Sequence, residues 1–413
     1  MRAITGCFHT TPTSALEAET GLPPPNLRLL GKILQSITRM QTVPPQHPIH
    51  RWVTRAWRGY QEYSYQSNLE NLVKRYPEFT NHELEEIHPF IRPPWWTPNL
   101  HIRIDNTKEE AENYHRSLIE GTHDALLIYS DGSGYKKGIG TAAYSPTIEQ
   151  LKAQYLGKET ESYVYAAELE GIHMATVMAR LNPTACCFIF VDSQAAIRAT
   201  ANPKRQSGQA IVKRILDMID SIIKWNPQFS LSIEWIPGHQ GIEGNERVDK
   251  EAKQAACGTT PRPGSKHLKS ARCTAIQKLI KSEWQKSWQH GKEDAHQLRN
   301  ISRRPNVKHG AQLYQEIGNR KQIAWISRLR TGHCSLNKYL AQFNIIEDPT
   351  CECGEAAETV AHFLLKCGLY DKERDRLRRK VGAQGMRIEK LLGDIECIHA
   401  TIEFIKGTGR FKF

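Results

Sequence analysis

The stretch Leu-Leu-Ile-Tyr-Ser-Asp-Gly-Ser at residues 126–133 decides the fold of the central part of the chain. Its apolar run closes on Asp131 and a glycine, which is typical of a buried strand with a carboxylate at its end. A second apolar run, Cys-Cys-Phe-Ile-Phe-Val at 186–191, closes in the same way on Asp192. The sequence therefore predicts two buried strands whose ends carry acidic side chains.

Two further acidic residues lie in helical patterns. Glu168 falls within a helix predicted at about residues 163–181, with small residues one and two turns later that would let the helix approach a sheet. Asp249 falls within a last helix predicted at 245–256, just after the Gly-rich loop Pro-Gly-His-Gln-Gly that carries His239. Each acid alone is most often a solvated surface residue, so the argument depends on all four together.

The surrounding pattern predicts an α/β fold with a mixed five-stranded sheet and helices on its faces. We expect strands at 125–130, 138–144, 151–156, 186–191 and 230–236, and helices at 163–181, 194–201, 209–225 and 245–256. Gly132 and Gly134 are expected to make the tight first connection. Ser162 and Ser193 are expected to be the N-caps of the helices that follow them.

Four carboxylates at one end of a sheet would repel one another unless cations were bound. Oxygen ligands of this kind suit Mg²⁺, with Mn²⁺ as an alternative. Two such ions roughly 4 Å apart can clamp a scissile phosphate. The sequence thus favours a two-metal site for phosphodiester hydrolysis, formed by Asp131, Glu168, Asp192 and Asp249.

The order of these residues resembles that of a type 1 ribonuclease H. This resemblance implies Mg²⁺-dependent endonucleolytic cleavage of the RNA strand of RNA/DNA hybrids, with Asp131 bridging both ions and with 5′-phosphate and 3′-hydroxyl products. It also implies that His239 serves in proton transfer and product release, as a loop imidazole that titrates near neutrality can. One alternative is a nuclease of the same broad fold but of another type, such as a transposase or an exonuclease.

Substrate-binding residues are less well defined. Polar candidates near the predicted site are Ser133, Ser193, Gln194 and Asn245. Lys204 and Arg205 occupy the position at which some ribonucleases H carry a basic protrusion. A hybrid-cleaving enzyme must sense the 2′-hydroxyls of one strand and their absence from the other.

The positive charge of the chain is concentrated after the central region. The chain of 413 residues carries a formal charge of +12, from 56 Lys+Arg and 44 Asp+Glu. Between Arg262 and Arg330 there are 16 Lys+Arg and 4 Asp+Glu, so that this segment accounts for the whole excess. We interpret it as a phosphate-binding surface beside the nuclease. The alternative is a solvated charged linker. Trp284 and Trp288 lie in a helix predicted at 268–290, and we expect them in core or interface positions rather than as base-stacking platforms.

Residues 1–121 show no catalytic spacing. Proline clusters limit their helices, predicted at 15–20, with Ser14 as N-cap and Gly21 at the end, and at 27–40. The stretch at 6–24 resembles the segment that follows the polymerase in fungal non-LTR retrotransposon proteins. The polymerase signature Tyr/Phe-x-Asp-Asp does not occur in the sequence. We therefore expect no DNA synthesis by this chain.

A Cys/His motif lies near the C-terminal end of the sequence. Cys351, Cys353, His362 and Cys367 form the spacing C-x-C-x8-H-x4-C, which fits a structural Zn²⁺ site. The stretch from Thr331 to Cys367 also resembles the zinc-binding element of non-LTR retrotransposon polyproteins, and His333 and Cys334 could substitute or support. The alternative is reduced surface thiols in a short helical hairpin.

These observations predict a remnant that follows a reverse transcriptase (1–121), a ribonuclease H domain (122–257), a basic helical connector (258–330) and a zinc-binding module with a charged tail (331–413). We interpret the chain as the C-terminal part of a fungal-type non-LTR retrotransposon protein, or a fragment of one. The partner is a nucleic acid, with no membrane involved. No apolar h-region opens the sequence, so we expect an intracellular, not a secreted, protein, in either the nucleus or the cytoplasm. The rival hypothesis is a catalytically inactive nucleic-acid-binding remnant.

Overall fold

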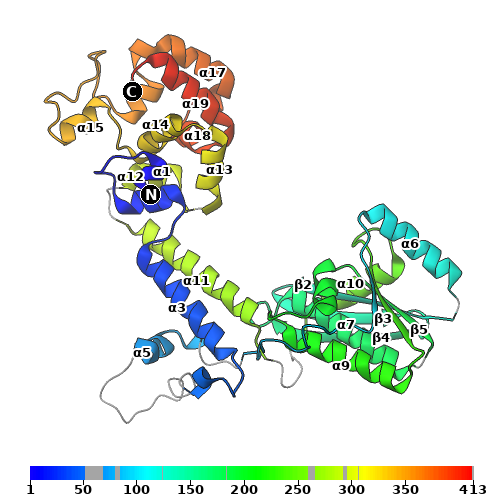
Figure 1. Ribbon diagram of the computed structural model, residues 1–413. Helices are drawn as coiled ribbons and strands as arrows, with labels where there is room; N and C mark the ends of the chain where they lie inside the picture. Colours follow the sequence, from blue (N-terminus) through cyan, green and yellow to red (C-terminus); the bar gives the residue numbers. More distant parts are fainter. Residues whose placement is uncertain are drawn as a thin grey trace. The chain divides into compact units, whose positions relative to one another are not determined.

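The computed structural model describes residues 1–51, 68–79, 84–122, 124–182, 184–258, 266–291, 295–305 and 307–411. These residues form two compact units, residues 32–277 and residues 1–31 with 278–413 (Figure 1). The first 31 residues are thus grouped with the C-terminal helices. The division into four segments that the sequence suggests, with boundaries after residues 121, 257 and 330, stays a prediction. Among the described residues, none of the helices has the length and apolar character that crossing a bilayer requires.

A mixed six-stranded sheet forms the centre of residues 32–277, in the order β1-β6-β5-β2-β3-β4. Strands β2, β3 and β4 pair antiparallel, whereas β5, β6 and β1 continue the sheet in parallel. The strands are β1 (His101–Arg103), β2 (Leu126–Tyr135), β3 (Gly138–Ser145), β4 (Gln150–Lys158), β5 (Cys186–Val191) and β6 (Ser230–Trp235). The five predicted strands are all present. The sequence analysis missed the sixth strand, β1, because its three residues include no apolar run.

Helices cover both faces of this sheet. Those of this unit are α5 (Asn68–Arg75), η1 (Pro77–Phe79), α6 (Lys108–Gly121), α7 (Val164–Leu181), α8 (Gln194–Ala201), α9 (Gln209–Trp225) and α10 (Glu243–Ala255). Helices α3 (Pro25–Gln41) and α11 (Lys269–Gln289) contain the positions at which the two units divide. The predicted helices at 194–201 and 209–225 agree with α8 and α9.

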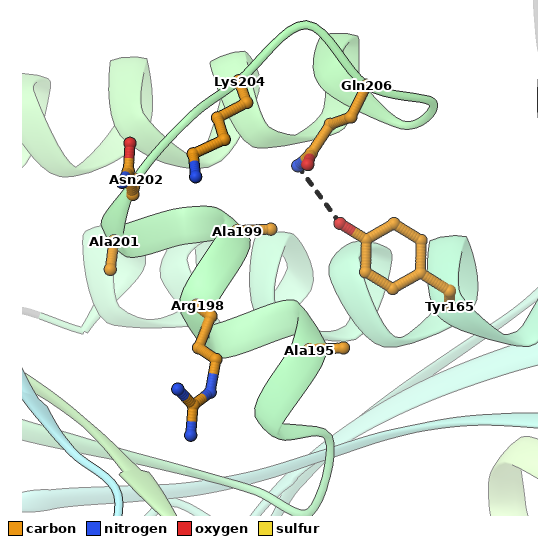
Figure 2. Close-up of a pocket in the computed structure, with 8 residues that line it drawn as sticks. All are labelled: Tyr165, Ala195, Arg198, Ala199, Ala201, Asn202, Lys204 and Gln206. Carbon is orange, nitrogen blue, oxygen red and sulfur yellow. Dashed lines mark hydrogen bonds between the residues drawn. The ribbon is translucent and has the colours of Figure 1, made fainter.

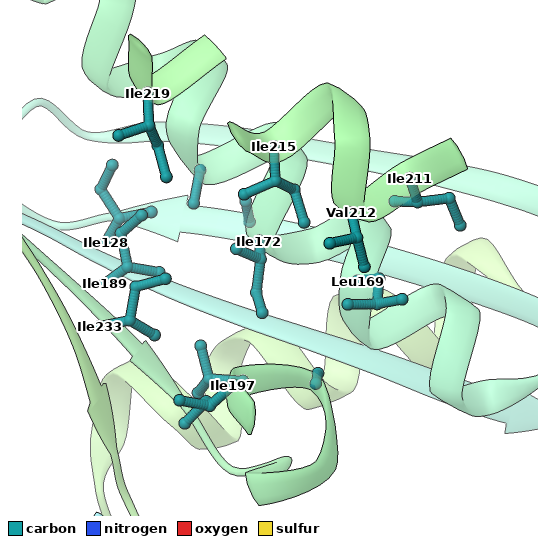
Figure 3. Close-up of a cluster of buried hydrophobic side chains, with 14 of the residues drawn as sticks. Ile128, Leu169, Ile172, Ile189, Ile197, Ile211, Val212, Ile215, Ile219 and Ile233 are labelled. Carbon is teal, nitrogen blue, oxygen red and sulfur yellow. The ribbon is translucent and has the colours of Figure 1, made fainter. Parts of the chain in front are cut away.

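The alternation of side chains along the strands builds two hydrophobic cores. Leu126 and Ile128 of β2 pack with side chains of α7 and α9 on one face (Figure 3). Tyr129 of β2 and Phe190 of β5 pack with Val248 of α10 on the other face. Each fully buried aliphatic or aromatic side chain contributes roughly 1.5–3 kcal/mol to folding. The sheet is therefore held between two layers of helices.

The first hairpin turns later than the glycines suggest. Strand β2 continues through Gly132 and Gly134 to Tyr135, and the turn is made by Lys136 and Lys137, with φ of 47° and 66°. The predicted connection at the two glycines was wrong. Gly132 is needed for a different reason, because a Cβ there would lie 2.2 Å from the backbone nitrogen of Glu168. The glycine lets α7 approach the strand.

Four predicted helix caps can be compared with the structure. Ser193 is confirmed as the N-cap of α8, since its hydroxyl accepts a hydrogen bond from the Ala196 amide. Ser162 is not the N-cap of α7, because residues 158–162 form a turn of their own and Tyr163 precedes the helix. Ser14 is not an N-cap either, because α2 (Thr13–Thr20) begins one residue before it. The predicted end of this helix at Gly21, in left-handed conformation, is confirmed.

The other unit is helical. Its elements are α1 (Arg2–Thr5), α2, α12 (His296–Ile301), α13 (Val307–Ile317), α14 (Arg320–Thr331), α15 (Asn337–Gln342), α16 (Val360–Leu365), η3 (Gly368–Tyr370), α17 (Asp371–Gly385), α18 (Ile388–Gly393) and α19 (Ile395–Thr408). A buried ion pair joins Glu19 of α2 to Arg330 of α14, with Nε–Oε2 of 2.8 Å. Trp284 and Trp288 are each only 3% exposed, which confirms their predicted core positions.

Candidate active site

Three carboxyl groups meet where β2 and β5 run side by side. Asp131 and Asp192 follow Ser130 and Val191, which are paired in the parallel register, and Glu168 reaches them from α7. One oxygen atom from each of the three residues lies within 4.8 Å of the others. Small residues on α7 permit this approach, since a Cβ at Gly171 would contact the backbone oxygen of Asp131 at 3.3 Å.

Asp249 lies close to this group without joining it. Burial and then charge repulsion, to which Asp249 contributes, raise the pKa of Asp131 and of Asp192, but Asp249 is not among the three residues whose oxygens lie within 4.8 Å. Its Oδ2 instead accepts a hydrogen bond from Lys253 Nζ at 2.6 Å, one turn along α10. The structure thus brings three of the four predicted acids together and leaves the fourth paired to a lysine.

Burial and mutual repulsion make the carboxyl groups harder to deprotonate than usual. Burial, reinforced by Asp192 and Asp249, raises the pKa of Asp131 to about 7. Burial and the charge of Asp131 raise the pKa of Glu168 well above its ordinary value. Asp131 Oδ2 and Glu168 Oε2 are buried without a hydrogen-bond partner. Buried acceptor oxygens without donors fit a site for a hard divalent cation.

His239 lies in the loop between β6 and α10, next to the carboxyl cluster. Its backbone is in the left-handed region, with φ of 58°. Burial and the charge of Asp249 raise the pKa of Asp192, and a positive charge on the His239 ring would oppose this increase. The preceding Gly238 leaves room for this approach, since a Cβ there would lie 2.8 Å from Asp192 Oδ2.

The polar candidates have different surroundings. Ser133 is buried, and the Ser193 hydroxyl accepts the hydrogen bond that caps α8. Gln194 Oε1 accepts from Arg198 at 3.3 Å. Asn245 is buried and its Oδ1 has no partner.

A pocket of about 520 Å³ lies beside α8, and sequence reasoning identified only Lys204 in it (Figure 2). Arg198 and Lys204 supply its positive charges, and Gln206 Nε2 donates to the hydroxyl of Tyr165 at 3.2 Å. Arg198 was not predicted, although its position on the helix that Ser193 caps was a usable signal.

The second candidate site is in the other unit. One ligand atom from each of Cys351, Cys353, His362 and Cys367 lies within 4.8 Å of the others. The sulfur atoms of Cys351 and Cys367 are 3.6 Å apart, and Cys353 Sγ lies 3.2 Å from His362 Nε2. Tetrahedral zinc with Zn–S bonds of about 2.3 Å requires sulfurs separated by roughly 3.8 Å. The donor set and its spacing therefore fit Zn²⁺.

Local structure explains how one residue between two cysteines suffices. The Gly354 amide donates to the carbonyl of Cys351 at 2.8 Å, and Gly354 has φ of 75°. This tight turn directs both cysteines toward one point. Cys334, named from the sequence as a possible substitute, is instead buried in the hydrophobic core. His333 packs edge-on against Tyr339.

Residues 123–257 match the RNase H family. The match includes all four acids and His239. With it, the predicted ribonuclease H-like sheet with flanking helices is confirmed as a fold class, with six strands in place of five.

The matches to individual proteins are short or have low sequence identity. The Pol polyprotein from type-1 retrotransposable element R1 2 of Nasonia vitripennis is 33% identical over 51 residues, which span 12% of this chain and 12% of that relative. RNase H1 from the archaeon Halobacterium salinarum NRC-1 is 16% identical, over 32% of this chain and 96% of that one, with a TM-score of 0.25. Protease-reverse transcriptase of prototype foamy virus is 18% identical, over 34% of this chain and 22% of that one, with a TM-score of 0.28.

Proposed function

We propose that the chain is a Mg²⁺-dependent endonuclease that hydrolyses the RNA strand of RNA/DNA hybrids. The observation that carries this proposal is the cluster of Asp131, Glu168 and Asp192 within a segment that matches the RNase H family. Buried oxygens of Asp131 and Glu168 that lack donors support a cation site there.

The carboxylates of Asp131, Glu168 and Asp192 would hold the ions, and Asp249 would complete the set once Lys253 releases it. Two bound Mg²⁺ ions would stabilise the charge on the attacking and leaving oxygens of the phosphodiester. Mn²⁺ is an alternative with the same preference for oxygen ligands.

His239 is proposed to move protons at the edge of this site. Its loop joins β6 to the helix that carries Asp249, and a Cβ at the adjacent Gly238 would lie 2.8 Å from Asp192 Oδ2. An imidazole can accept or donate a proton near neutral pH, and it can thereby assist departure of the product. We assign it no role as a metal ligand.

The hybrid is proposed to bind across the surface that includes α8. Arg198 and Lys204 beside the pocket of Figure 2 would contact phosphates. Ser133, Gln194 and Asn245 are candidates for contacts with the sugars. We also propose that lysines and arginines of the segment 262–330 bind phosphates, a contribution that should fall steeply with salt.

We infer further that Cys351, Cys353, His362 and Cys367 hold a structural Zn²⁺ ion, with three thiolates and one imidazole. The match to a retrotransposon Pol polyprotein supports the view that the chain derives from such an element. Within a retrotransposon, hybrid cleavage would remove template RNA after reverse transcription.

A catalytically inactive nucleic-acid-binding remnant is the rival. The hydrogen bond between Asp249 and Lys253 favours it, because an acid engaged by a lysine is not free to bind a cation.

The deciding experiment is cleavage of an end-labelled RNA/DNA hybrid by the purified chain with Mg²⁺ or with EDTA. Asp131→Asn is the test variant, and Asp124→Asn, an exposed aspartate just before β2, is the matched control. We expect Mg²⁺-dependent cutting of the RNA strand that only Asp131→Asn abolishes. Binding without cutting would support the remnant, and cutting of plain DNA duplex would indicate another nuclease type.

A further inference from the structure

Helix α6 lies before the segment that matches the RNase H family, yet it packs on the sheet that carries the acids. His115, on the buried side of α6, is 8% exposed. Its Nε2 lies 2.9 Å from the hydroxyl of Tyr129, in hydrogen-bond distance. Its ring also stands edge-on against Phe190, with centroids 4.7 Å apart.

These partners are directly connected to the candidate active site. Tyr129 precedes Asp131 by two residues on β2, so strand alternation puts their side chains on the same face of the sheet. Phe190 is the last residue but one of β5, and Asp192 directly follows the end of that strand. The rings of Tyr129 and Phe190 are themselves in contact, with centroids 4.9 Å apart.

Tyr129 also contacts the first turn of α10. A Cβ at Gly244 would lie 2.3 Å from Cε2 of Tyr129, so the helix backbone rests against this ring. Gly244 is in the first turn of the helix that carries Asp249, and it follows the His239 loop. A displaced Tyr129 ring would therefore move both the fourth acid and the histidine loop.

Helix α6 and the His239 loop line a pocket together. The pocket has a volume of about 450 Å³ and lies between Glu112, Arg116 and Glu120 of α6 and the loop residues Gln240 and Gly241. Helix α6 and the loop therefore face the same pocket, which Tyr129 also lines.

We propose that α6 is part of the catalytic domain and that His115 is a positioning residue, which acts through Tyr129 on the carboxylates and on the His239 loop. This inference rests on the proposed nuclease function. It predicts that loss of the His115–Tyr129 hydrogen bond impairs turnover and cation binding while hybrid binding is retained.

The test compares three variants of the full chain with the unsubstituted chain. His115→Leu removes the hydrogen bond but still fills the buried space with a side chain. His115→Gln retains a group that can form a hydrogen bond with the tyrosine hydroxyl. Ile215→Val, in the core on the opposite face of the sheet, is the control for a general loss of stability. Cleavage is measured as kcat and KM, Mg²⁺ binding by calorimetry, and folding by circular dichroism.

We expect His115→Leu to lower kcat at least about fivefold with KM unchanged, because a displacement of 1 Å can cost about 100-fold. Its Mg²⁺ affinity should fall as well, and His115→Gln should recover most of both losses. Equal kcat and Mg²⁺ affinity in His115→Leu and Ile215→Val would overturn the proposal.

Failure of the nuclease proposal itself is distinguishable. It would appear as an unsubstituted chain that binds the hybrid and does not cut it. The calorimetric comparison would then still decide the role of His115. If the unsubstituted chain bound no Mg²⁺ either, both proposals would be wrong.

Discussion

Lys253 Nζ and Asp249 Oδ2 lie 2.6 Å apart on neighbouring turns of α10, so the fourth predicted acid is paired to a lysine. The hydrogen bond to Asp249 raises the pKa of Lys253, so the lysine stays charged. An ammonium group beside three clustered carboxyls is in competition with a divalent cation for the same negative charge.

Replacement of Lys253 by methionine should therefore ease cation binding. Asp249 would be released, and one positive charge would leave the vicinity of the ions. Because the lysine side chain is 45% exposed, solvent screening limits the effect. We expect the Mg²⁺ concentration for half-maximal cleavage to fall about threefold, a modest change for a screened charge. Lys250→Met, at an exposed position of the same helix, is the control and should change nothing. A higher Mg²⁺ requirement in Lys253→Met would show instead that the lysine assists the site.

Gly132→Ala should strongly destabilise the sheet-containing unit. The added Cβ would lie 2.2 Å from the backbone nitrogen of Glu168, and neither backbone can yield without moving α7. Overpacking against side chains already costs about 1–3 kcal/mol, so we expect at least about 3 kcal/mol here. Gly121→Ala is the control, because nothing lies within 4 Å of the position that its added methyl group would take. Thermal unfolding of both variants checks this, and equal midpoints would contradict the close approach of α7.

Much of the site could be predicted because its residues are marked by local patterns. Asp192 closes an apolar run whose limits, Cys186–Val191, agree with β5. Ser193 caps the next helix as its sequence suggests. The Cys/His cluster could be predicted because metal-binding residues follow restricted spacings.

The misplaced features depend on contacts between distant residues. Glycines 132 and 134 resemble a turn, yet the turn is formed by Lys136 and Lys137 in left-handed conformations that lysine rarely adopts. Gly140 likewise serves close packing, since a Cβ there would lie 2.3 Å from the Ala256 nitrogen. Strand β1 and the role of α6 exist only through pairing with β6 and packing on the sheet. Asp249 and Lys253 have the i, i+4 spacing of helix neighbours. This spacing alone does not predict whether Asp249 binds the lysine or a metal ion.

Stability of the sheet-containing unit should fall on acidification in a way that depends on His115. Burial lowers the pKa of this histidine from 6.5 to about 4. The unfolded chain therefore takes up the proton first, and the contribution to stability is complete above pH 6.5 and is lost as pH falls toward 4. Between about pH 7 and pH 5 the loss should be about 2 kcal/mol from this group.

Urea unfolding at the two pH values measures this loss. His115→Leu has no titrating group at the position, so its unfolding free energy should change less between the two pH values than that of the unsubstituted chain. The difference between the two chains removes the contributions of other titrating groups. An identical pH dependence in both would mean that the imidazole is hydrated, and it would contradict the burial of this side chain.

Zinc removal should affect the helical unit. We expect one Zn²⁺ per chain, held by the four residues of the Cys/His cluster, and its loss in Cys367→Ser, because removal of one thiolate breaks a tetrahedral set. Metal binding contributes to the folding free energy of small zinc sites, so a chelator should lower the unfolding midpoint of this unit. Cys397→Ser is the matched control, since this cysteine lies in the same unit outside the cluster. Elemental analysis of the purified variants decides the matter. Retention of zinc by Cys367→Ser would exclude the proposed ligand set, whereas loss of zinc from both variants would point to a general failure of folding.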